Sequence, residues 1–218
     1  MKKSKYQKKV DETEKLIRLA LKARPSREQA LSAVRTIIKY IGENPDRPGL
    51  VKTPERVIRA WEEWTEGYNK KYIQKQTLSI LNGQFDDGAE QASEMICVQD
   101  VKTWSHCEHH LAEFAISADV AYIPSKGGKI LGLSKLVRVV EMFSKRLQVQ
   151  ERLTNQIADF IQIHCRPLGV GVVIRAEHSC MRTRGVKSFS AFATTSALRG
   201  EFLTVPEVRS EFLQLTRR

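Results

Sequence analysis

Apolar residues recur at helical spacing through the first third of the chain. A loose stripe over residues 10–21 predicts one helix. Ser26 and Gln29 have the spacing of a capping box and predict the start of a second helix. A third helix is predicted to begin at Thr53 as N-cap, with Pro54 in its first turn. The residues expected to be buried are Ala30, Val34, Ile37, Ile38 and Ile41 in the second helix and Val57, Ala60, Trp61 and Trp64 in the third.

The pattern changes after a polar segment in the middle of the chain. Residues 68–93 contain glycine and aspartate among polar residues, and we interpret them as a linker with at most a short strand. From Phe114 to Tyr122 apolar residues alternate over nine positions, which predicts a half-buried strand. Further strands are predicted over 95–101, 170–176 and 190–196, and helices over 134–143 (with Ser134 as the cap), 149–161 and 207–215.

This order of elements predicts an α+β fold. Residues 1–93 would form a helical N-terminal region with its linker, and residues 94–218 a domain with a largely antiparallel sheet and helices on one face. No apolar run approaches the roughly 18 residues that a membrane helix needs. The lysines at the N-terminus are not followed by the apolar block of a secretory signal, so we expect a cytoplasmic protein with no membrane partner.

The positive charge of the chain changes this picture little. The net charge is +11, but residues 1–35 hold 11 Lys or Arg against 4 Asp or Glu and so carry +7 of it. The remaining residues carry only +4, the difference between the two values. A basic segment with almost no interleaved aromatic residues is more often a solvated arm than a reader of nucleic acid. Nucleic acid is therefore not the expected partner.

Histidine and cysteine gather at two places in the chain. The segment 104–110 holds three of the five histidines and one of the four cysteines, and His178 and Cys180 follow about 70 residues later. Cys107 and His110 are three residues apart, so one turn can aim both at a single point. His178 and Cys180 are two apart, so in an extended strand they would share a face. Thiolate and imidazole favour zinc over magnesium or calcium, which take oxygen ligands.

The number of ligands separates two kinds of zinc site. Cys107, His110 and Cys180 would form a three-ligand set with a fourth position for water, which is typical of a catalytic site. A structural site would want a fourth ligand, and His109 or His178 could supply it. Without a metal, these residues would be buried thiols and surface histidines. In the catalytic interpretation, His109 and His178 are left as general acid and base, since their unperturbed pKa is about 6.5.

Four separated motifs resemble those of the GTP cyclohydrolase I family. They occur in the family's order, and the resemblance reaches upstream to TPERV at 53–57, so that it spans roughly residues 28–215. Several motifs in the right order are far more specific than any one of them. The motifs are CEHH at 107–110, GLSKLVR at 132–138, RLQVQERLT at 146–154 and HSCMRTRG at 178–185.

The resemblance implies an activity and roles for the clustered residues. The family opens the imidazole ring of GTP at C8, releases formate, and recloses the product to 7,8-dihydroneopterin triphosphate, the first step of pterin and folate-type synthesis. Zinc would bind the residues matching Cys107, His110 and Cys180 and supply the attacking water. His178 matches the histidine that protonates N7 of the purine, and His109 matches a second acid or base.

The resemblance also implies substrate contacts, a fold and an oligomer. Glu151, with Gln150 beside it, matches the residue that accepts the two donors of guanine. Lys135, Arg138 and Arg184 match the family's binders of the triphosphate, and Ser134 can add a hydroxyl or a backbone amide at the start of its helix. Arg56 is a fourth cation that could reach a neighbouring subunit's site. The fold would be the tunnelling fold, with a four-stranded antiparallel sheet and two helices on one face. It would assemble as a homodecamer with sites at subunit interfaces.

The same clustered residues allow two other functions. Sister enzymes of the same fold use a different ligand set or a cysteine nucleophile without zinc, so the three-ligand set argues against them. The alternative from another class is a zinc-stabilised binding module whose basic N-terminal arm contacts nucleic acid.

Overall fold

The computed structural model describes residues 24–86 and 94–217. Contacts divide the chain into two units, one ending at Glu63 and the other beginning at Trp64. The helix predicted over residues 10–21, most of the basic arm and residues 87–93 lie outside the described residues. The domain boundary drawn from the sequence between residues 93 and 94 stays a prediction.

The first unit is built on the predicted second and third helices, α2 (Arg27–Tyr40) and α3 (Thr53–Trp64). The capping box at the start of α2 is confirmed, because the Ser26 hydroxyl accepts from the backbone N–H of Gln29 at 3.2 Å and the Gln29 side chain accepts in return. The expected apolar face of α2 is only partly buried. Ile38 is buried, whereas Ile37 and Ile41 are 60% and 69% exposed.

The interpretation of residues 68–93 as a linker with at most a short strand is wrong for residues 70–81, which form a helix. A short 3-10 helix, η1 (Glu66–Tyr68), leads into a full helix, α4 (Lys70–Leu81), and only β1 (Gln84–Phe85) is the expected short strand. The Asn69 side chain caps α4 by accepting from the backbone N–H of Lys71 at 3.0 Å. Ile80 is fully buried. The helix forms because a few apolar residues share one face, although the lysines and glutamines between them make the segment polar overall.

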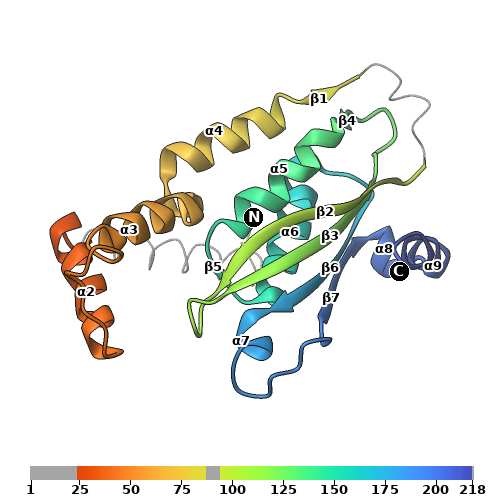
Figure 1. Cartoon of the computed structure of the whole chain (residues 1–218). Coiled ribbons are helices and arrows are strands. Elements are labelled where there is room, and N and C mark those ends of the chain that lie inside the picture. Colours follow the sequence, from red (N-terminus) through yellow and green to blue (C-terminus); the bar gives the residue numbers. More distant parts are fainter. Residues whose placement is uncertain (1–23, 87–93, 218) are drawn as a thin grey trace, which may run out of the picture. The chain divides into compact units, whose positions relative to one another are not determined.

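The second unit carries the predicted antiparallel sheet (Figure 1). Four long strands run antiparallel in the order β2, β3, β6, β7, and a two-residue strand, β5, lies parallel to β2 at the edge. The α+β class is therefore confirmed, and the fifth strand is a feature that the sequence did not predict. The bounds are β2 Ile96–Cys107, β3 Glu113–Ile123, β5 Leu147–Gln148, β6 Gly169–His178 and β7 Ala193–Gly200, with β4 Ile130–Leu131 paired to β1 in a separate ribbon.

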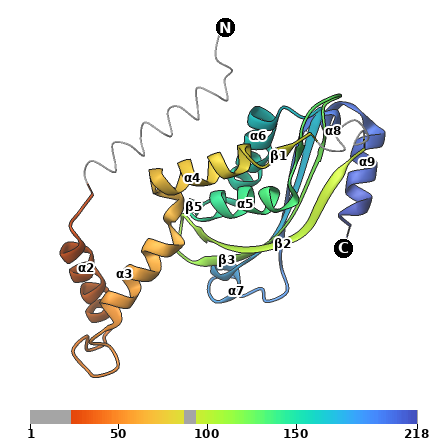
Figure 2. The same ribbon diagram turned by 90° about the horizontal axis from the view of Figure 1, so that it is seen from above.

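Two long helices cover one face of this sheet, and the C-terminal helices contact the other (Figure 2). Alternate residues of β3 divide between the two faces: Val120 and Tyr122 belong to the larger core under α5 (Leu133–Ser144) and α6 (Gln150–Cys165). Ala121 and Ile123 belong to a smaller core. That smaller core includes Phe202 of α8 (Glu201–Thr204) and Phe212 of α9 (Pro206–Leu215), which pack edge to face at 5.3 Å.

The start of α5 differs from the sequence prediction. The helix begins at Leu133 with Gly132 as N-cap and no capping side chain, so Ser134 lies in the first turn and is not the cap. The preceding strand β4 is fixed instead by Tyr122, whose hydroxyl accepts from the backbone N–H of Leu131 at 2.8 Å. The start of α5 is therefore tied to the Tyr122 end of the sheet.

A buried ion pair ties the C-terminal helix to the sheet. Asp119 of β3 is fully buried, and its carboxylate accepts from Arg175 of β6 at 2.7 Å. The same carboxylate accepts from the backbone N–H of Asp100 at 2.9 Å, at an irregularity of β2 where Asp100 has a φ of 58°. Arg175 also donates to the backbone carbonyl of Thr216, just after α9. One buried pair thus joins two strands and the C-terminus.

Among the described residues, no helix is long and apolar enough to cross a membrane.

Candidate metal centre and active site

The first two candidate ligands come from one tight turn at the end of β2. The backbone N–H of Leu111 donates to the Cys107 carbonyl at 2.9 Å, and the N–H of Cys107 donates to the Ala112 carbonyl at 2.8 Å. Leu111 has a φ of 54°, in the left-handed region that costs a branched residue roughly 1–2 kcal/mol. The closed turn places Cys107 and His110 on the same side, as their spacing predicted. Cys107 is buried and His110 is exposed.

The third candidate ligand comes from the end of β6. His178 is the last residue of that strand and lies opposite Phe114 of β3. The strand does not continue, so the expectation that His178 and Cys180 share a strand face is wrong. Cys180 instead lies in α7 (Ser179–Arg182), a single helical turn that directs it toward Cys107. The ligand atoms of Cys107, His110 and Cys180 all lie within 4.8 Å of one another.

These three residues fit a zinc ion. Zn–S and Zn–N bonds of about 2.3 and 2.0 Å place tetrahedral sulfur and nitrogen ligands about 3.5 Å apart. The Cys107 sulfur lies 3.8 Å from Nδ1 of His110, close to that value. Burial raises the pKa of the Cys180 thiol, and the neighbouring Cys107 raises it further. Two adjacent thiols lose both protons readily only beside a cation, so the pair suits a metal.

The distance to the Cys107 sulfur does not by itself distinguish His109 from His110 as the imidazole ligand. Nδ1 of His109 lies 3.7 Å from the Cys107 sulfur, as close as that of His110. The group whose ligand atoms lie within 4.8 Å of one another contains His110 together with Cys107 and Cys180, which makes His110 the better candidate ligand. His109 is exposed beside the cluster. Nη1 of Arg184 lies 3.1 Å from Nε2 of His110. A guanidinium only donates hydrogen bonds. If a metal bound Nδ1 of His110, Nε2 would carry the proton, two donors would face each other, and the Arg184 side chain would have to turn away.

The predicted proton-transfer residue His178 is held from two sides. Its ring stacks on Phe114 with centroids 4.5 Å apart, and its Nε2 lies 2.9 Å from the Gln150 side-chain oxygen. Burial lowers the pKa of His178, and the nearby charge of Glu151 acts in the opposite direction. Glu151 is exposed in the first turn of α6, whereas Gln150, the residue before it, is 3% exposed. One chain thus brings together the metal cluster, His178 and both residues at the start of α6.

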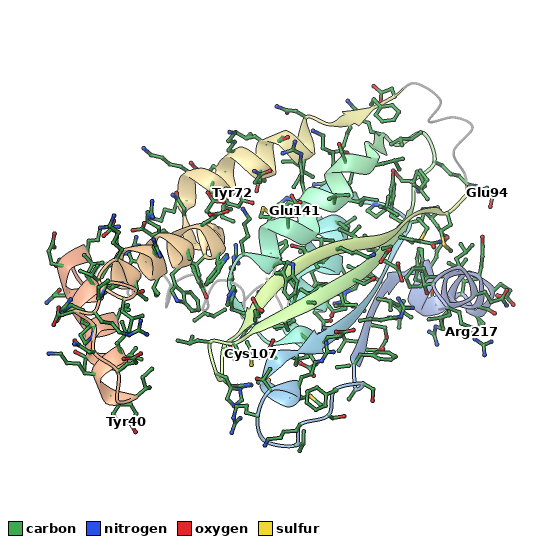
Figure 3. The ribbon with its side chains drawn as sticks, viewed as in Figure 1. Tyr40, Tyr72, Glu94, Cys107, Glu141 and Arg217 are labelled. Carbon is green, nitrogen blue, oxygen red and sulfur yellow. The ribbon has the colours of Figure 1, made fainter. Side chains whose placement is uncertain are left out.

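The remaining predicted cations lie elsewhere. Lys135 and Arg138, on α5, donate to Ser79 and Gln76 of α4, at 3.2 and 3.3 Å. The start of α5 is tied to Tyr122, eight residues along β3 from Phe114 at the metal end. Eight strand residues at about 3.4 Å each correspond to about 27 Å of strand. Figure 3 shows these two ends of the sheet, with Glu94 and Cys107 at opposite ends of β2. Ser134 lies with these cations, and Arg56 is exposed on α3 in the other unit.

Two neighbours of the site were not identified as functional from the sequence. Arg152 donates to the Glu108 carboxylate and, at 3.1 Å, to the Gln148 side chain, and so braces the turn between the two ligands. Phe114 supports the His178 ring. Arg152 lies inside a quoted motif, which was the only available signal, whereas Phe114 looks like any other apolar strand residue.

Comparison with known proteins agrees with the motifs. The model of the GTP cyclohydrolase I family matches residues 30–217. GTP cyclohydrolase 1 of Janthinobacterium sp. (strain Marseille) is 51% identical over 183 residues, which cover 84% of this chain and 88% of that one. GTP cyclohydrolase 1 of Chlorobium chlorochromatii (strain CaD3) is 50% identical over 184 residues, covering 84% and 78%.

Likeness to solved structures is weaker. The archaeosine synthase QueF-Like in the apo form matches with a TM-score of 0.40 and 16% identity, over 49% of this chain and 93% of that chain. A likeness at this level carries no argument. The family match covers most of the chain and includes all four motifs, and it confirms the resemblance. The chain belongs to the GTP cyclohydrolase I family.

Proposed function

We propose that this chain performs the GTP cyclohydrolase I reaction with a zinc ion held by Cys107, His110 and Cys180. The activity follows from family membership, since close relatives that carry this name match over most of their length. The observation that carries the zinc assignment is the approach of two thiols and one imidazole within 4.8 Å, beside a half-buried histidine. When bound there, zinc supplies a Lewis acid that lowers the pKa of a water molecule to about 7.

The chain's own residues supply the proton transfers. His178 is two residues from the proposed ligand Cys180, and an imidazole with an unperturbed pKa of about 6.5 both takes and releases a proton near neutral pH. Burial lowers the pKa of His178, which favours the neutral ring before the substrate binds. We assign it the protonation of N7, which makes C8 of guanine more electrophilic. His109, which is exposed and has its Nδ1 3.7 Å from the Cys107 sulfur, is the second acid or base. Glu151 accepts N1–H and the 2-amino group of guanine, because one carboxylate matches two adjacent donors.

The triphosphate requires cations that a single chain does not place together. Arg184 is beside the metal cluster, but Ser134, Lys135 and Arg138 are at the opposite end of the sheet. We therefore assign these three residues to the site of a neighbouring chain, with Arg56 as a further cation. This requirement supports sites at subunit interfaces in a homo-oligomer, for which the family pattern is a decamer. The four long antiparallel strands with α5 and α6 on one face support the tunnelling fold.

The state of the cysteines supports a location for the protein in the cell. All four cysteines are free, and two of them are the proposed thiolate ligands. Thiols of this kind persist in a reducing compartment, which supports the cytoplasm.

GTP turnover with metal analysis tests the proposed function. Purified protein incubated with GTP is expected to release one formate per GTP and to give a product that fluoresces as neopterin after oxidation and dephosphorylation. Metal analysis of the same sample is expected to find about one zinc per chain. Zinc without formate release would support the zinc-stabilised binding module instead. Formate release that persists after complete removal of metal would refute the zinc assignment.

A mixing experiment tests the shared site. Arg138→Ala and Cys180→Ser are each expected to be inactive when purified alone. Co-expressed at equal amounts, they should recover about a quarter of wild-type activity, because a site that draws on two chains at random takes both intact residues one time in four. No recovery, despite mixed oligomers detected by two different affinity tags, would show that Arg138 and Cys180 act within one chain.

A further inference from the structure

Gln150 is an amide side chain buried almost completely at the start of α6. It is 3% exposed, and it is in contact with the proposed proton-transfer residue His178. Its side-chain nitrogen lies 3.0 Å from each of two backbone carbonyls, those of Ile174 and Ala193. The same nitrogen lies 3.2 Å from the hydroxyl of Thr195. The amide is therefore satisfied inside the protein.

These contacts fix which way the amide points. Carbonyl oxygens only accept, so the NH2 group must face Ile174 and Ala193. The flipped amide would place its oxygen against both carbonyls, with no hydrogen bond to either. The Gln150 oxygen therefore faces His178, 2.9 Å from Nε2. An amide oxygen only accepts, so the His178 Nε2 must carry the proton in this contact.

Two hydroxyl groups extend the arrangement to the edge strand. Thr154 donates to the backbone carbonyl of Gln150 at 2.8 Å, so its single proton is used there. The hydroxyl groups of Thr154 and Thr195 are 2.6 Å apart. Thr195 must therefore donate to Thr154, and it accepts from Gln150. The two amide protons of Gln150 are shared among three acceptors, the two backbone carbonyls and the Thr195 hydroxyl, and all three place the NH2 group on the side away from His178.

The other restraint on the His178 ring is steric. Phe114 is stacked on it with an interplanar angle of 15°. With Nε2 bonded to Gln150 and one face against Phe114, the ring has one preferred orientation. The nitrogen that remains for the substrate is Nδ1.

We propose that Gln150 is a positioning residue, which holds Nε2 of His178 protonated and facing the protein, so that Nδ1 is the nitrogen that takes up a proton and then passes it to the substrate. The proposal replaces the expected substrate contact of the Gln150 side chain, and it rests on the proposed role of His178. A residue that orients an acid–base group lowers kcat when it is removed, whereas a residue that binds the substrate in ground state and transition state alike changes KM.

Kinetics of variants test the positioning role. Gln150→Met is expected to lower kcat about 100-fold with KM for GTP within about threefold, since acid–base catalysis contributes at least that much. Thr195→Val removes one of the three acceptors that hold the amide, and it should have a smaller effect, lowering kcat about fivefold. Thr195→Ser, which keeps the hydroxyl, should restore the wild-type value. Thr194→Val is the matched control, because Thr194 is the next residue of β7 and its side chain is exposed.

The outcomes distinguish the alternatives. A raised KM with unchanged kcat in Gln150→Met would make Gln150 a substrate contact and overturn the proposal. Equal kcat values in Thr195→Val and Thr194→Val would overturn it too, even if Gln150→Met does not fold. Zinc content is measured in every variant, and a loss of metal that parallels the loss of kcat would assign the effect to the metal site and refute positioning.

A spectroscopic measurement separates this inference from the proposed function. Solid-state ¹⁵N spectra of histidine-labelled, zinc-loaded protein distinguish the two neutral tautomers, and His178→Gln identifies the signal. The Nε2–H tautomer is expected in the wild type and a mixture in Gln150→Met. An Nδ1–H tautomer in active wild-type enzyme would refute the inference alone. The Nε2–H tautomer in a protein that does not convert GTP would support the inference and refute the proposed function.

Discussion

Replacing Asp119 with alanine removes the acceptor from the buried ion pair that joins β3, β6 and the C-terminus. Asp119 is fully buried, and the Arg175 side chain is 19% exposed, so water would compensate the lost partner poorly. In the variant, the Arg175 guanidinium keeps its hydrogen bond to the Thr216 carbonyl. The variant also removes the hydrogen bond from the backbone N–H of Asp100 to the Asp119 carboxylate.

The expected cost follows from these losses. Breaking a buried ion pair by removing one partner costs about 3–5 kcal/mol. Because Arg175 keeps one acceptor and some exposure, we expect Asp119→Ala to lower the free energy of unfolding by about 3 kcal/mol, near the lower end of that range. With a urea m-value of about 2 kcal/mol/M, the unfolding midpoint would fall by about 1.5 M.

Urea unfolding followed by circular dichroism measures this change, at one protein concentration for all variants. The matched control is Asp86→Ala, which breaks an exposed ion pair with Lys129 at 3.6 Å and should change the midpoint little. The double variant Asp119→Leu with Arg175→Met should recover most of the loss, because no unpaired charge remains. A midpoint for Asp119→Ala equal to that of Asp86→Ala would refute the reasoning.

Three further predictions concern single sites. Cys180→Ser should lose most of the bound zinc while keeping its circular dichroism spectrum, and equal zinc in this variant and in the control Cys97→Ser would exclude the ligand assignment. Gly67→Ala should lower the melting temperature by several degrees, since a Cβ there would lie 2.3 Å from the Lys145 carbonyl oxygen, and an unchanged melting curve would contradict that packing. Burial raises the pKa of Cys165 from 9.0 to about 11, so its native alkylation by iodoacetamide at pH 7.5 should be about 100-fold slower than in urea. Peptide mass spectrometry measures both rates, and similar values would contradict the burial.

Much of the metal cluster could be predicted because its geometry is local. Cys107 and His110 are close in sequence, and one turn of backbone determines how near they come. The alternation from Phe114 to Tyr122 correctly predicts a single strand, but the strand is half-buried only in its first part, and from Ala118 onward both of its faces are buried. Cys180 was correctly joined to the cluster, but through a helical turn and not through the strand that the spacing suggested.

The features that the sequence did not predict depend on distant contacts. Residues 70–81 form a helix because Ile80 and its neighbours find a core built from other segments, although their composition is polar. The exposure of Ile37 and Ile41 depends on what covers α2, which the helix's own pattern does not specify. In the sequence, Gln150 is a polar residue next to an expected substrate contact. Only the fold buries its side chain, where it donates to backbone carbonyls of β6 and β7.

The sheet of the second unit has two open edges. β7 pairs with β6 on one side, and β2 is paired on its outer side only at His106 and Cys107, by the two residues of β5. Within residues 24–86 and 94–217, the sheet thus ends at β7 on one side and at β2, with its two-residue neighbour β5, on the other. Such edges pair with any extended chain, the wrong one as readily as the right one. A newly made chain is thus exposed to misassociation until another strand reaches each edge, and its yield on refolding should depend on how quickly correct neighbours are found.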